Sequence, residues 1–177
     1  MNRYVAAAAA ALALMLVAAA FIFMFAPTDA LQGPVQRIFY LHVSSAIAAF
    51  VSFAVVVVGS VAYLWRESIV GDRVARSAAL VGVVFTTVTL VMGMMWAKPI
   101  WGTFWTWDAT WWRTVHPGPV ISTDALPPEM LFTFLFTMAC TLVLAAVMIA
   151  IRYRIEALTD ALPEAQFVLQ AARRSTS

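Results

Sequence analysis

The chain has 177 residues, of which 63% are hydrophobic and 11% are charged, and its formal net charge is +2. A soluble domain is about half apolar and about one quarter charged. The apolar excess is too large for the core of one domain of this length, so lipid must be the solvent for much of the chain. The net charge is small and no basic cluster lies beside aromatic residues in a polar segment, which argues against nucleic-acid binding.

Motifs for several other kinds of chemistry are absent from the sequence. It contains no P-loop, no GxGxxG and no HExxH, so the sequence offers no motif for ATP binding, dinucleotide binding or zinc-dependent hydrolysis. Cys140 is the only cysteine, which excludes an intramolecular disulfide and a CxxC site. We interpret it as a small apolar residue. No nucleophile–base pair is apparent, so we expect that the protein is not an enzyme.

Four stretches are long and apolar enough to cross a bilayer as helices, which takes about 20 residues each. We therefore predict an all-α, polytopic membrane protein with four transmembrane helices, at about residues 4–25, 38–65, 74–95 and 130–151. The first stretch is longer than the apolar region of a usual signal peptide, and the Ala-Pro-Thr-Asp that follows is a poor cleavage site. We therefore expect it to be a retained span.

The distribution of Lys and Arg predicts the orientation, because cytoplasmic loops carry the excess of these residues. Eight lie on one side of the four spans: Arg3, Arg66, Arg73, Arg76, Arg152, Arg154, Arg173 and Arg174. Three lie on the other: Arg37, Lys98 and Arg113. We therefore expect both termini in the cytoplasm, and the loops at 26–37 and 96–129 to face outward.

The chain divides into a membrane domain, residues 1–155, and a charged cytoplasmic tail, residues 156–177. Within the tail, Pro163 is suited to the first turn of a helix, since its missing N–H needs no partner there. We expect a short separate helix from Pro163 to about Arg173.

Tryptophan is concentrated in the second outer loop. Six of the seven tryptophans lie within the 17 residues from Trp96 to Trp112. An aromatic belt at the membrane interface would explain them, but a belt marks both interfaces and the inner one has only Trp65. The alternative, which we favour, is an aromatic platform for a flat, largely apolar ligand, with Asp108 orienting the loop backbone or an indole N–H.

The chain has two histidines, and the predicted topology places both on the outer side. His42 lies near the outer end of the second span, and His116 lies in the loop that carries the tryptophans. A single histidine is usually a satisfied polar residue, but here the pair brackets the aromatic platform. Because imidazole is a good axial ligand of haem iron, we predict that His42 and His116 bind haem. Three basic residues on this side would suit carboxylates such as haem propionates or lipid headgroups, namely Arg37, Lys98 and Arg113.

Three segments resemble a known family. Trp101-Gly-Thr-Phe-Trp105-Thr-Trp107-Asp108 is similar to the tryptophan-rich "WWD" signature of the haem-handling proteins of cytochrome c maturation. Arg37-Ile-Phe-Tyr-Leu-His42-Val resembles the family segment around its first histidine. Trp111-Trp112-Arg113-Thr-Val-His116-Pro-Gly resembles the segment around its second histidine, as found in the CcmC branch.

The resemblance implies a function. CcmC proteins hold haem b at the outer face of the bacterial cytoplasmic (inner) membrane and present it to the haem chaperone CcmE, together with the CcmA/CcmB transporter and CcmD. Carried onto matching positions of this sequence, the axial ligands are His42 and His116. The rest of the haem site comprises Trp101, Trp105, Trp107, Asp108 and Arg37.

One difference from the family concerns the number of spans. CcmC proteins have two further spans between the WWD loop and the second histidine, whereas Asp108 and Trp111 are nearly adjacent here. A structural membrane subunit without haem, packing through small residues such as Gly59, Ser60 and Gly82, is therefore an alternative. A b-type electron-transfer protein is a weaker one, because such proteins usually place their histidines on facing helices within the bilayer.

Overall fold

The computed structural model describes residues 3–104 and 126–175, with the side chains beyond Pro163 described only for Gln166. The described chain is helical apart from short connections. The elements are α1 (Arg3–Ala20), a π-helical turn η1 (Phe21–Phe25), a 3-10 turn η2 (Pro34–Gln36), α2 (Arg37–Arg66), α3 (Ile69–Trp101) and α5 (Pro128–Ser175). Four helices are long and apolar enough to cross a membrane, which confirms the predicted all-α, four-span membrane protein.

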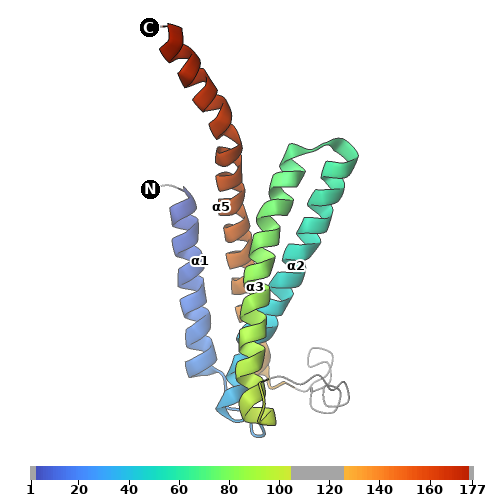
Figure 1. The fold of residues 1–177 in the computed structure, drawn as a ribbon. Helices are drawn as coiled ribbons and strands as arrows, with labels where there is room; N and C mark the ends of the chain where they lie inside the picture. The colour runs from blue at the N-terminus through green and yellow to red at the C-terminus, as the bar shows by residue number, and fades with distance from the viewer. Residues whose placement is uncertain (1–2, 105–125, 176–177) are drawn as a thin grey trace.

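The helices run side by side with their connections at two opposite ends (Figure 1). We call one end the turn end: it holds the α2–α3 connection at residues 66–69, and the described start of α1 points the same way. The other is the loop end, formed by residues 26–36 and by the ends of α3 and α5 at residues 102–104 and 126–128. This arrangement places His42 and the tryptophans of α3 together at the loop end.

Two helices differ from their expected bounds. α3 runs from Ile69 to Trp101 and so includes residues that we assigned to the outer loop. Its last turn contains Pro99, and it ends where Gly102 adopts a left-handed conformation with φ 75° and donates its N–H to the Lys98 carbonyl at 2.9 Å. Glycine is favoured at this position because a side chain there would be strained.

α5 continues to Ser175 through Pro163, so the expected separate helix in the tail does not form. Charged side chains hold the second half of α5. Arg152 pairs with Glu156 at 2.7 Å along the helix, and Arg73 of α3 pairs with Asp160 at 2.7 Å. Arg76 of α3 also pairs with Glu156 at 3.1 Å, so residues 156–160 are tied to α3.

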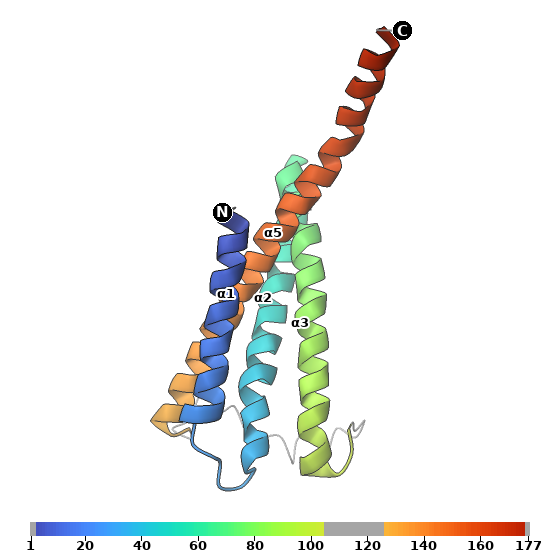
Figure 2. The ribbon, with the colours of Figure 1, turned by 90° about the vertical axis from the view of Figure 1, so that its left-hand side faces the viewer.

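α5 crosses the bundle diagonally (Figure 2). At the loop end it packs against η1 through edge-to-face and tilted ring contacts, with Phe21 5.4 Å from Phe132 and 5.0 Å from Phe136 between ring centroids. At the turn end it meets α3 through the ion pairs of Arg73 and Arg76. α5 therefore links α1 to the α2–α3 pair.

Two clusters of buried side chains hold the bundle together. Where α2, α3 and α5 meet, the core comprises Ala48, Ala49, Val81, Phe85 and Ala145. Nearer the loop end, η1, α2 and α5 bury Ile22, Ala26, Tyr40 and Phe134. Large apolar side chains elsewhere point outward, among them Leu16, Phe50, Val58 and Leu64, as expected of surfaces that face lipid.

Two glycines allow α2 and α3 to approach each other closely near the turn end. A Cβ atom added to Gly59 would lie 2.7 Å from the carbonyl oxygen of Gly71, and one added to Gly71 would lie 2.8 Å from the carbonyl oxygen of Gly59. Neither contact leaves room for a side chain. Small residues at helix crossings are a common means of association in membranes, where the hydrophobic effect does not drive helices together.

Replacing Gly59 with valine should therefore destabilise the α2–α3 pair. The added side chain has to displace backbone, which typically costs about 1–3 kcal/mol. We expect a lower thermal midpoint of the detergent-solubilised protein for Gly59→Val than for Ala54→Val, a matched change at an exposed position of the same helix. Equal midpoints for the two variants would contradict the close packing.

Candidate functional site

The side chain of His42 lies between α2 and α3 at the loop end. Its Nδ1 atom is 2.9 Å from the carbonyl oxygen of Thr89 on α3. A carbonyl oxygen can only accept, so this contact requires a proton on Nδ1, and in the neutral imidazole Nε2 then carries none. Nε2 is then the nitrogen with a free lone pair, and the described residues provide no hydrogen-bond partner for it. The arrangement leaves one nitrogen of a half-buried imidazole ready to bind a metal.

Gly93 forms the surface of α3 against which the imidazole rests. A Cβ atom at this position would lie 3.0 Å from Cε1 of His42 and 3.3 Å from Nδ1. Thr89, Gly93 and Trp96 follow each other at i, i+4 and i+7, so they share one face of α3. The hydroxyl of Thr89 is engaged with the Phe85 carbonyl at 2.8 Å, and the contact with His42 is made by the Thr89 backbone alone.

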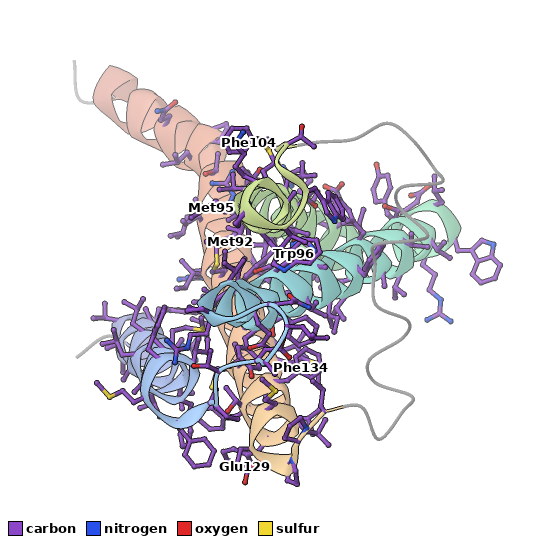
Figure 3. The ribbon with its side chains drawn as sticks, turned by 90° about the horizontal axis from the view of Figure 1, so that it is seen from below. Met92, Met95, Trp96, Phe104, Glu129 and Phe134 are labelled. Atoms are coloured by element: carbon purple, nitrogen blue, oxygen red, sulfur yellow. The ribbon has the colours of Figure 1, made fainter. Side chains whose placement is uncertain are left out.

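Trp96 lies on the same face of α3, near the end of the bundle, and its ring extends toward α2 (Figure 3). Its indole Nε1 donates to Oε1 of Gln32 at 2.9 Å. Gln32 is positioned by a tight turn in which Oδ1 of Asp29 accepts from the backbone N–H groups of Leu31 at 2.9 Å and Gln32 at 2.7 Å. The connection at residues 26–36 is thereby tied to the tryptophan segment.

Of the predicted platform residues Trp101, Trp105, Trp107 and Asp108, only Trp101 belongs to the described residues. Its ring meets Trp96 edge to face, with centroids 5.2 Å apart and planes inclined by 80°. Nζ of Lys98, one of the three basic residues predicted for the outer side, donates to the Gly102 carbonyl at 2.9 Å and lies 5.1 Å from the ring centroid of Phe104. The two indoles at the end of α3 therefore form one aromatic surface, which begins at Trp96, about one helical turn beyond Gly93.

Arg37 begins α2, five residues before His42. Its Nε atom is buried and has no hydrogen-bond acceptor among the described residues, and neither does Oε1 of Gln36 have a donor there. A buried donor without an acceptor is costly, so an anionic ligand group would be favoured at Arg37. The rise along the helix between Arg37 and His42 is about 7.5 Å.

The other predicted site residues lie outside the described residues. They are His116, Trp105, Trp107, Asp108 and Arg113. Their roles remain predictions. Among the described residues no group of three His, Cys, Asp or Glu side chains could hold a bare metal ion. Cys140 is buried in α5, in agreement with its interpretation as a small apolar residue.

Three residues at the site were not identified from the sequence: Gln32, Thr89 and Gly93. Thr89 contributes only a backbone carbonyl, which has no signature in the sequence. In the sequence, Gly93 does not differ from the other small residues of an apolar span. The i, i+4, i+7 spacing of Thr89, Gly93 and Trp96 was a usable signal, but only once His42 was known to face α3.

The contact between Gln32 and Trp96 gives a direct test of how the loop end is held together. We expect Gln32→Leu to speed exchange of the Trp96 indole proton with solvent by about fivefold, the factor that corresponds to one hydrogen bond of about 1 kcal/mol. NMR of protein labelled with ¹⁵N-tryptophan measures this exchange. Gln32→Glu keeps an acceptor and should stay near wild type, and equal exchange in all three proteins would show that the contact does not protect the indole.

Comparison with known proteins identifies the family. The profile of the CcmC family, described as "Heme exporter protein C", matches residues 1–110, more than half of the chain. Heme exporter protein C of Escherichia coli K12 is 43% identical over 88 residues, which cover 49% of this chain and 36% of that protein. The protein of the same name from Paracoccus denitrificans is 39% identical over 82 residues, covering 46% and 34%.

A relative from a plant has a similar match. A ccmC-like mitochondrial protein of cytochrome c biosynthesis from Marchantia polymorpha is 40% identical over 84 residues, covering 48% of this chain and 37% of its own length. The matched region thus spans about a third of each relative. The family match includes α1, α2, α3 and the described part of the tryptophan segment, and on this basis the chain belongs to the CcmC family.

Proposed function

We propose that this chain binds haem b at the outer face of the bacterial cytoplasmic membrane and presents it to a haem chaperone during cytochrome c maturation. The main observation behind the proposal is how the two ring nitrogens of His42 are hydrogen-bonded. Its Nδ1 is occupied by the Thr89 carbonyl, and its Nε2 is left without a partner among the described residues. Metal-binding histidines typically donate their second nitrogen to a carbonyl or carboxylate in this way, which fixes the tautomer and orients the ring.

The surroundings of His42 fit haem better than a bare metal ion. Haem needs one or two axial ligands, an apolar surface of flat shape, and partners for its propionates. Trp96 and Trp101 provide ordered indoles, and the buried Nε of Arg37 is a donor that lacks an acceptor among the described residues. Arg37 binds a carboxylate well because its planar guanidinium can donate two parallel hydrogen bonds.

The remaining predicted residues complete the proposed site. His116 supplies the second axial ligand, while Trp105, Trp107 and Asp108 extend the platform that begins at Trp101. In this proposal haem is cargo, held by coordination, stacking and ion pairing, and no covalent bond is made to it. Delivery to the CcmE chaperone, with CcmA/CcmB and CcmD as further partners, is part of the proposal and is based on the resemblance to the CcmC family.

The absorption spectrum of purified protein tests haem binding. We expect a Soret band in wild type and at least a tenfold lower haem content in His42→Ala and in the double variant His42→Ala/His116→Ala, since outer-shell partners alone are worth about 10- to 100-fold in metal affinity. Cys140→Ser is a matched control and should keep the wild-type spectrum. Full haem content in the double variant would overturn the ligand assignment, and haem-free wild type would favour a structural subunit.

The proposed orientation can be tested by cysteine labelling, because Cys140 is the only native cysteine. In a Cys140→Ser background, Leu31→Cys places a thiol at a position that is 96% exposed at the loop end. Arg66→Cys places one at the turn end and leaves seven of the eight positive residues on that side. We expect an impermeant maleimide to label Leu31→Cys in intact spheroplasts and Arg66→Cys only after permeabilisation. The reverse pattern would contradict an outward-facing site.

A further inference from the structure

The contact between His42 and α3 depends on a glycine. In an α-helix the carbonyl of residue 89 accepts the N–H of residue 93, and its second lone pair is reached through the groove beside that residue. His42 enters this groove, because Nδ1 lies 2.9 Å from the Thr89 oxygen. A Cβ atom on residue 93 would stand in the same groove, 3.0 Å from Cε1 and 3.3 Å from Nδ1.

We propose that Gly93 is a positioning residue for haem binding: by keeping the groove beside the Thr89 carbonyl open, it holds His42 in the Nδ1–H tautomer and turns Nε2 toward the ligand. A free imidazole favours the opposite tautomer, with the proton on Nε2, which would block coordination through that atom. The inference rests on the proposed function for the identity of the ligand, but the tautomer itself is a property of the haem-free chain.

A second glycine of α3 provides a matched control. Gly82 lies eleven residues before Gly93, about three helical turns, and so faces α2 in the same way. A Cβ atom at Gly82 would lie 3.1 Å from two ring carbons of Phe53. Gly82→Ala therefore crowds an aromatic ring of α2 to nearly the same extent as Gly93→Ala, but it does so away from His42.

The decisive experiment is ¹⁵N NMR of histidine-labelled full-length protein in detergent micelles without haem. His116→Gln removes the other histidine, so that every histidine signal comes from His42. We expect wild-type His42 in this background to show a protonated Nδ1 and an unprotonated Nε2. In Gly93→Ala the ratio of the Nδ1–H to the Nε2–H form should fall by about fivefold or more, the factor expected for one lost hydrogen bond. Gly82→Ala should keep the wild-type ratio.

Two results would overturn the inference: an Nε2–H tautomer in the unaltered Gly93 protein, or an unchanged ratio in Gly93→Ala. If Gly93→Ala does not fold, the hydrogen bond between His42 and Thr89 can be tested in the wild-type protein. A magnetisation-transfer contact between ¹⁵Nδ1 of His42 and the ¹³C-labelled carbonyl of Thr89 is expected in wild type, and its absence would contradict the proposed hydrogen bond.

Haem titration separates this inference from the proposed function. If both hold, Gly93→Ala weakens haem binding by about 10- to 100-fold, as outer-shell changes do, and Gly82→Ala does not. A wild-type protein with the Nδ1–H tautomer that takes up no haem would refute the proposed function, while the control of the tautomer by Gly93 would stand. Equal haem affinity in Gly93→Ala and wild type would refute the positioning role.

Discussion

The packing of α2 against α3 is the contact on which the rest of the structure depends. At the turn end Gly59 and Gly71 bring the two backbones together, and at the loop end Gly93 admits the ring of His42 to the backbone of α3. In lipid, such contacts must come from close packing and hydrogen bonding, because burial of apolar surface gives little advantage. The same pair of helices therefore provides both the scaffold and the proposed haem ligand.

α5 connects this pair to α1 by different means at its two ends. Phenylalanine rings join it to η1 at the loop end, and Arg73 and Arg76 bind its acidic residues at the turn end. The charged groups of these ion pairs are open to solvent, which screens them, so each pair contributes little to stability. They tie residues 156–160 of α5 to α3. The polar contacts of the loop end, from Asp29 through Gln32 to Trp96, connect residues 26–36 to the aromatic surface.

The sequence predicted the parts of the fold that depend on hydropathy. The second span was expected at 38–65 and α2 runs from Arg37 to Arg66, because the apolar run ends at charged residues on both sides. The lengths of α3 and α5 were underestimated, because hydropathy indicates where an apolar stretch ends and not where the helix ends. His42 was predicted as a ligand because it and His116 bracket the tryptophan segment. Thr89 and Gly93 were not predicted. Thr89 contributes a backbone carbonyl and Gly93 contributes space, and neither role can be inferred from the residue type.

The central claim is that Nε2 of His42 binds haem iron with its Nδ1 proton held by α3. The most direct measurement is electron–nuclear double resonance on the ferric haem complex of protein labelled with ¹⁵N-histidine. The account predicts a strongly coupled ¹⁵N signal that loses the His42 contribution in His42→Ala. A haem complex without histidine coupling, or with coupling unchanged by His42→Ala, would contradict it.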